Sequence, residues 1–162
     1  MITVKDLSHS FNERLMNLTQ NIDEVIRVFD TYKTDSLKNA TRQKRRQGKD
    51  PIQYQIRDET SIKHLTMSRF FSHEKTKADL TKYLAEKTLY YSKYSSKLVI
   101  TSASGQTRSN KDMEPFDGNN HEKADTLMTC LAASSTRRNP RDMQLTFFLT
   151  LHRYPGLGNW QL

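Results

Sequence analysis

EVIRVFD, residues 24–30, is the stretch of this sequence that decides its fold. Its β-branched and aromatic residues predict a short buried strand with Asp30 at the carboxyl end. Two further apolar runs, KLVIT at residues 97–101 and LTFFL at residues 145–149, predict a second and a third strand, and each follows a helical pattern. Because strands that alternate with helices are typical of parallel sheets, we expect an α/β fold: a layered, small and mostly parallel sheet flanked by helices.

The first helix is expected over about residues 1–20, before the first strand. Thr3 and Asp6 predict a capping box at its start. Apolar residues at spacings of four, four and three share one face of this helix and predict its buried side. They are Leu7, Phe11, Leu15 and Leu18. Further helices are expected over residues 37–47, 72–91 and 121–134.

Residues 49–72 allow two interpretations. Apolar residues alternate over residues 52–56, as in an edge strand, but the rest of the stretch is typical of an irregular packed segment. Ser104 and Gly105 predict a turn, and the polar residues 107–120 predict a loop.

The composition bounds the class of protein. The chain has 162 residues, a net charge of +8 and 35% hydrophobic residues, which predicts a thin core even with glycine counted. We expect a partial domain over residues 1–149 and a frayed tail over residues 150–162. No apolar run is long enough for a membrane span, and the first thirty residues are too polar for a secretory signal. These features predict a nuclear or cytoplasmic protein that is not secreted, has no membrane partner and can meet polyanions.

A basic segment, residues 33–49, is the strongest compositional signal. It holds seven lysines and arginines against one acid, Asp35: Lys33, Lys38, Arg42, Lys44, Arg45, Arg46 and Lys49. On the expected helix Lys38, Arg42 and Arg45 share one face, and such a face can follow a phosphate backbone. Two other interpretations are a solvated helix face and a nuclear import signal at residues 44–46.

Carboxylates at the ends of elements are the second signal. Asp30 ends a strand, and Glu122 and Asp125 fall in the first turn of an expected helix. At the carboxyl edge of a parallel sheet such acids can hold Mg²⁺, which prefers oxygen ligands. The alternative for Glu122 and Asp125 is compensation of the helix dipole.

Other chemistry has little support. The five histidines form no zinc motif, and the single cysteine, Cys130, excludes an internal disulfide framework. The tyrosines near the second strand are spaced like a helix face, so we expect them to pack rather than to stack on bases. They are Tyr83, Tyr90, Tyr91 and Tyr94.

A family resemblance emerges from these residues together. VFDTYKTDSLK (28–38) and TRQKR (41–45) resemble the strand and basic helix of PIN-like, flap-endonuclease-type proteins, which occur in many copies in animal genomes, often beside transposon-like sequence. The resemblance continues through residues 98–101 to NHEKADTLM (120–128), where the family usually has Glu-Glu-Ala-Asp-Thr. It covers about residues 25–149.

The resemblance implies a phosphodiesterase fold in which acids at strand ends hold divalent ions that activate water. Asp30, Glu122 and Asp125 match family acids, so Asp30 and Asp125 are the implied metal ligands, with Mg²⁺ as the ion. The chain departs from the family at Lys123, which replaces a glutamate, and after Phe148, where the family's Asp-Thr-Asp turn is missing. The family's opening strand with its aspartate is also missing.

These departures predict an inactive, degenerate fragment of a nuclease that retains sequence-independent nucleic-acid binding. The implied nucleic-acid contacts are Lys38, Arg42, Lys44, Arg45, Arg46 and Lys49. Two alternatives remain open: a small basic interaction or nucleic-acid-binding protein without nuclease ancestry, and a still-active Mg²⁺-dependent nuclease.

Overall fold

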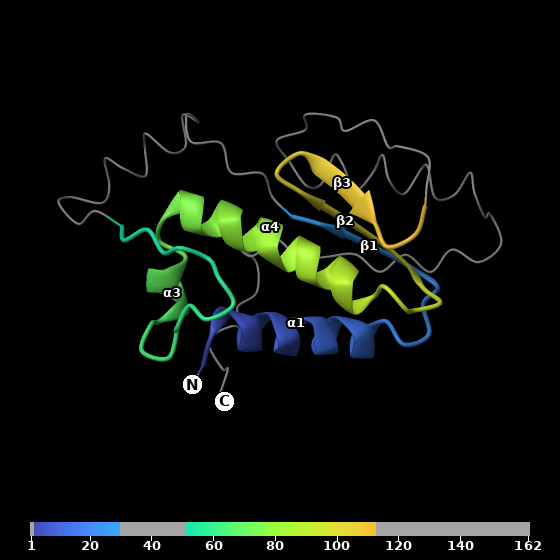
Figure 1. Cartoon of the computed structure of the whole chain (residues 1–162), viewed down its shortest axis with the longest axis horizontal. Coiled ribbons are helices and arrows are strands. Elements are labelled where there is room, and N and C mark those ends of the chain that lie inside the picture. Colours follow the sequence, from blue (N-terminus) through green and yellow to red (C-terminus); the bar gives the residue numbers. More distant parts are fainter. Residues whose placement is uncertain (1, 30–50, 113–162) are drawn as a thin grey trace.

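The computed structural model describes residues 2–29 and 51–112, which form an α/β arrangement (Figure 1). Two long helices lie side by side, and the second of them packs against a small sheet. In chain order the elements are α1 (Val4–Leu18), β1 (Glu24–Val28), α3 (Met67–Phe70), α4 (Glu74–Tyr91), β2 (Leu98–Ala103) and β3 (Gln106–Ser109). The structure thus confirms the coarse α/β class, the first helix and the helix between the first two strands.

The sheet has the order β1-β2-β3. β1 and β2 are parallel, with Glu24 opposite Leu98 and Val28 opposite Ser102. The chain from β1 to β2 runs through α4, so these elements form the parallel crossover that the sequence predicts. β2 and β3 are antiparallel. Within the described residues the sheet is therefore mixed, and the expectation of a mostly parallel sheet is corrected.

β3 is a strand where the sequence predicts a polar loop. The two residues between β2 and β3, Ser104 and Gly105, both have positive φ, at 51° and 77°. A two-residue turn of this kind has a twist that matches paired strands, so it folds the chain back and pairs Ala103 with Gln106. The turn, rather than the polar side chains, thus determines the strand.

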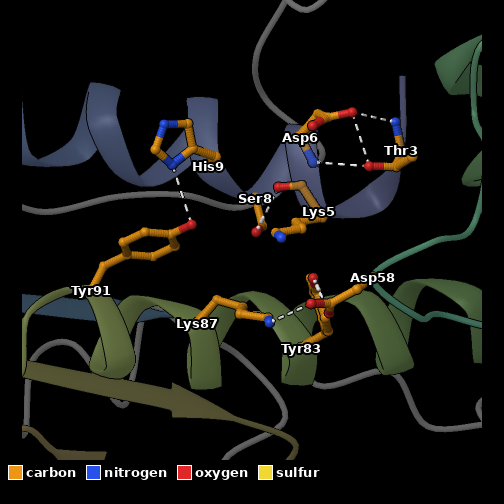
Figure 2. Close-up of polar contacts among 9 residues, drawn as sticks. All are labelled: Thr3, Lys5, Asp6, Ser8, His9, Asp58, Tyr83, Lys87 and Tyr91. Carbon is orange, nitrogen blue, oxygen red and sulfur yellow. Dashed lines mark hydrogen bonds and ion pairs between the residues drawn. The ribbon is translucent and has the colours of Figure 1, made fainter. Parts of the chain in front are cut away.

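The start of α1 matches the predicted capping box. The amide of Asp6 donates to Thr3 Oγ1 at 3.2 Å, and the amide of Thr3 donates to Asp6 Oδ2 at 2.9 Å (Figure 2). The predicted apolar face is right only in part: Leu15 is buried, Leu7 and Phe11 are partly buried against the core, and Leu18 is 63% exposed. The helix ends at Leu18, and its buried positions stop one turn earlier. These buried positions are Val4, Ser8, Asn12 and Leu15.

Residues 52–56 lie outside the sheet, so the edge-strand interpretation is wrong. The packing predicted for the rest of the stretch is confirmed, since Ile62 and Phe70 are buried in the core, but residues 67–70 form the short helix α3 and not an irregular segment. Tyr54 and Ile56 pack against a core under α4 that includes Phe70 and Leu80. The amide of Tyr54 donates to Thr76 Oγ1 of α4 at 3.0 Å, which fixes the segment to this helix instead of to a strand.

The expected elements over residues 37–47, 121–134 and 145–149, and the tail 150–162, lie outside the described residues.

Candidate functional site

The carboxyl ends of β1 and β2 lie next to each other. Val28 is opposite Ser102, and the amide of Phe29 donates to the carbonyl of Ser102 at 2.8 Å. In an open parallel sheet this edge is where ligands bind. In the sequence, Asp30 and then the basic segment follow Phe29 directly.

Every site residue that the sequence predicts lies outside residues 2–29 and 51–112. This holds for the acids Asp30, Glu122 and Asp125 and for Lys123. It holds equally for the basic residues Lys38, Arg42, Lys44, Arg45, Arg46 and Lys49. In the sequence, residues 30–50 follow the carboxyl end of β1, whereas residues 113–162 come after β3, whose last residue, Ser109, pairs with Ile100 near the amino end of β2. The described residues contain no group of three or more histidine, cysteine or acidic side chains able to hold a metal ion.

Arg27, in the middle of β1, is the most unusual residue of the described part. Its side chain is buried, and the guanidinium carbon lies 3.8 Å from the centroid of the Phe11 ring and 4.2 Å from that of Phe29. Nη1 donates to Thr88 Oγ1 at 2.5 Å, whereas Nε and Nη2 have no hydrogen-bond partner among the described residues. Burial lowers the pKa of Arg27 well below its ordinary value, because removal from water disfavours the charged form.

A chain of hydrogen bonds continues from Arg27 through both long helices. Thr88 Oγ1 lies 2.7 Å from Asn12 Oδ1, and Asn12 Nδ2 donates to the carbonyl of Ser8 at 2.7 Å. The polar residues on the buried face of α1 therefore complete a network with β1 and α4. The sequence pattern did not reveal this network, since Arg27 interrupts an otherwise apolar strand and its partners come from distant elements.

Asp58, Tyr83 and Lys87 form a polar cluster that joins the segment before α3 to α4 (Figure 2). Tyr83 Oη donates to Asp58 Oδ1 at 2.8 Å, and Lys87 Nζ donates to Asp58 Oδ2 at 3.0 Å. The hydrogen bond from Lys87, helped by that from Tyr83, lowers the pKa of Asp58, and the same bond raises the pKa of Lys87. Burial raises the pKa of Tyr83, and so does its bond to Asp58. These pKa shifts keep Asp58 and Lys87 charged and Tyr83 neutral at neutral pH. The cluster is therefore suited to stabilising the fold and not to proton transfer at neutral pH.

An open groove of about 420 Å³ lies between residues 53–57 and α4. Its charged side chains have both signs: Arg57, Lys75 and Lys82 are basic, and Asp79 and Glu86 are acidic. Because the two signs nearly balance, the groove has no strong preference for a polyanion.

The tyrosines near the end of α4 differ from the sequence prediction. Tyr83 is partly buried against the core, as expected. Tyr90 and Tyr94 are 72% and 91% exposed, so the prediction that they pack is wrong for these two. Tyr91 is 40% exposed and packs against His9 of α1, with ring centroids 5.6 Å apart. The buried positions of α4 stop at Thr88, one turn before the helix ends, so no core covers Tyr90 and Tyr94.

Comparison with known proteins gives no relative. No family model, no curated protein and no solved structure matches this chain. Among the described residues, no helix combines the length and the apolar character that crossing a membrane requires.

Proposed function

We propose that this chain is a catalytically inactive PIN-like domain that binds nucleic acid without sequence preference through the basic segment. The crossover from β1 through α4 to β2 is the observation that carries this proposal. It sets the carboxyl ends of two parallel strands side by side, at the edge where ligands of such sheets bind. The basic segment begins in the sequence four residues after Phe29, at this edge.

The charge of the basic segment supports binding to phosphates. Six net positive charges fall within residues 33–49, since seven basic residues stand against Asp35. Each phosphate that a lysine or arginine neutralises releases condensed counterions, and this gain does not depend on the base sequence. The partner of the proposed function is therefore the phosphate backbone of DNA or RNA.

Two observations support the loss of catalysis. A two-metal phosphodiesterase needs several carboxylates at one point, but Lys123 stands at a family glutamate and no Asp-x-Asp turn follows Phe148. Phosphate binding needs only positive charge on a surface. A domain that has lost its metal-ligating acids can therefore lose hydrolysis and still bind nucleic acid.

The test is a titration of labelled single-stranded and duplex oligonucleotides with the full chain at low salt, read by fluorescence anisotropy. The variant R42Q/R45Q/R46Q should bind both ligands at least tenfold more weakly, because it removes three phosphate contacts. The control K63Q/R69Q/K82Q removes the same charge from exposed positions in the described part, so it should change the affinity much less. Equal losses in the two variants would show that net charge alone, and not the basic segment, holds the nucleic acid.

A further inference from the structure

Two exposed aromatic side chains stand at the carboxyl end of α4. Tyr90 is 72% exposed and Tyr94 is 91% exposed, and only three residues separate them in the chain. Tyr91, between them, lies edge-on to Tyr90 with ring centroids 5.9 Å apart. The hydroxyl of Tyr91 is 3.2 Å from His9 Nδ1, which ties this ring to α1 (Figure 2). Tyr90 and Tyr94 thus present large apolar surfaces to water from one end of a helix.

Tyr90 lies in the last turn of α4, and Tyr94 lies in the turn that follows it, residues 92–97, which is anchored to its surroundings. Asn110 Nδ2 donates to the carbonyls of Ser92 at 2.8 Å and Lys97 at 3.0 Å, and the carboxamide oxygen of Asn110 accepts from the amide of Val99. Lys97 Nζ donates to the carbonyls of Gln20 at 2.7 Å and Ile22 at 2.8 Å, beyond the end of α1. A ligand that uses the tyrosines therefore meets an ordered backbone and loses less conformational entropy on binding than it would on a mobile loop.

Basic residues predominate in the chain around these tyrosines. Between Lys87 and Lys111 there are five basic residues and no acid. They are Lys87, Lys93, Lys97, Arg108 and Lys111. Two of them pair with acids, Lys87 with Asp58 at 3.0 Å and Arg108 with Glu86 at 4.0 Å, so the excess of positive charge lies on the other three. Lys93 Nζ lies 5.4 Å from the centroid of the Tyr94 ring, so a cation flanks the most exposed aromatic face. His9, which contacts Tyr91, pairs with Glu13 on α1 at 3.3 Å.

We propose that Tyr90 and Tyr94, with Lys93, form a stacking platform for unpaired bases of a single nucleic-acid strand. The bases stack on the tyrosine rings, and Lys93 neutralises a neighbouring phosphate. A duplex keeps its base faces inside its own stack, so the platform discriminates in favour of single strands. This inference rests on the proposed function for its choice of nucleic acid as the partner, but it concerns another surface. The turn leads into the amino end of β2, whereas the basic segment follows the carboxyl end of β1.

The experiment compares Y90L/Y94L with Y90F/Y94F in the full chain. Leucine removes the aromatic face, whereas phenylalanine keeps it and removes only the hydroxyl, so the second variant is the matched control. The ligands are labelled oligothymidine and a duplex of equal length, titrated by anisotropy, with circular dichroism to verify folding. Stacking of a base on an aromatic ring contributes about 1 kcal/mol or more to the binding free energy, so Y90L/Y94L should weaken single-strand binding about thirtyfold. The phenylalanine pair should bind like the wild type, and duplex affinity should change little in either variant.

The outcomes separate this inference from the proposed function. Wild-type single-strand affinity in Y90L/Y94L would overturn the platform, even if duplex binding through the basic segment stands. Loss of affinity in Y90L/Y94L together with full binding by R42Q/R45Q/R46Q would support the platform and refute the basic segment. A wild type that binds neither ligand would refute both. A wild-type dimer that Y90L/Y94L dissociates without change in strand binding would assign the tyrosines to self-association and overturn the platform.

Discussion

The guanidinium carbon of Arg27 lies 3.8 Å from the centroid of the Phe11 ring, inside the interface between β1 and α1. Phe29, two residues further along β1, faces the same group at 4.2 Å. The one hydrogen bond of the guanidinium among the described residues goes to the neutral hydroxyl of Thr88 on α4. A single charged side chain thus contacts both long helices from the strand that leads to the proposed binding surface.

Replacing Arg27 by methionine should leave the protein as stable as the wild type or more stable. Burial of a charge costs free energy that two aromatic contacts and one hydrogen bond repay only in part. Methionine keeps the apolar contact with Phe11 and Phe29, and Thr88 can still donate to Asn12. The measurement is urea unfolding at neutral pH.

The control for this prediction is Arg27→Ala, which removes the packing as well as the charge. Alanine should lower the free energy of unfolding by about 3 kcal/mol, since it leaves a cavity between two rings. If the methionine variant were as unstable as the alanine variant, the charge of Arg27 would itself be required by the fold, contrary to this account.

Asp58 should make the stability depend on pH in the acid range. Its pKa is lower in the folded chain than in the unfolded one, so the contribution is complete above the ordinary value of about 4 and is lost as the pH falls through the lowered value. Because the carboxylate is more than one third exposed, the contribution should be about 0.5 kcal/mol.

Asp58→Asn isolates this effect, since the amide oxygen can still accept from Tyr83 but no longer carries a charge for Lys87. At pH 7 the variant should be the less stable one, and the difference in stability should shrink towards zero as the pH falls through the lowered pKa of Asp58. A stability difference that stays constant across this range would mean that the charge of Asp58 contributes nothing.

Thr3→Ala should destabilise α1 by about 1 kcal/mol, because it removes the hydroxyl that accepts from the amide of Asp6. Thr3→Ser keeps that oxygen and should cost much less. The measurement is the melting temperature of the two variants, which should be lower for Thr3→Ala than for Thr3→Ser. Equal melting temperatures would show that the hydroxyl of Thr3 does not stabilise α1.

Cleavage should be absent. With Mg²⁺ or Mn²⁺, the wild-type chain should leave single-stranded and branched DNA and RNA intact, and Lys123→Glu alone should not restore activity, because the Asp-x-Asp turn is still missing. The readout is the length of end-labelled substrates on a denaturing gel. Metal-dependent cutting that Asp125→Asn abolishes would identify a still-active nuclease and end the proposal of inactivity.

Local patterns in the sequence predicted those elements that local physics determines. The β-branched run of β1, the periodicity of α4 and the Thr3–Asp6 capping box all depend on neighbouring residues, and the structure confirms them. β3 was missed because its polar residues carry no strand signal, and two positive φ angles in the preceding turn impose the pairing.

The unusual side chains could not be predicted in the same way. Burial of Arg27 depends on Phe11 and Thr88, which are distant in the sequence and come together only in the fold. Helical spacing indicates which tyrosines share a face, but it does not indicate whether another element covers that face. In the structure Tyr90 and Tyr94 are exposed. The predicted acids and the basic segment lie outside the described residues, so those predictions stand as proposals.

The salt dependence of single-strand binding tests the central claim most directly, because it counts the phosphates that the chain neutralises. For the wild type the logarithm of the association constant should fall with the logarithm of salt concentration at a slope of about −3 to −4. For R42Q/R45Q/R46Q the slope should shrink to about −1, since three contacts are gone. An unchanged slope together with an unchanged affinity in this variant would contradict the account.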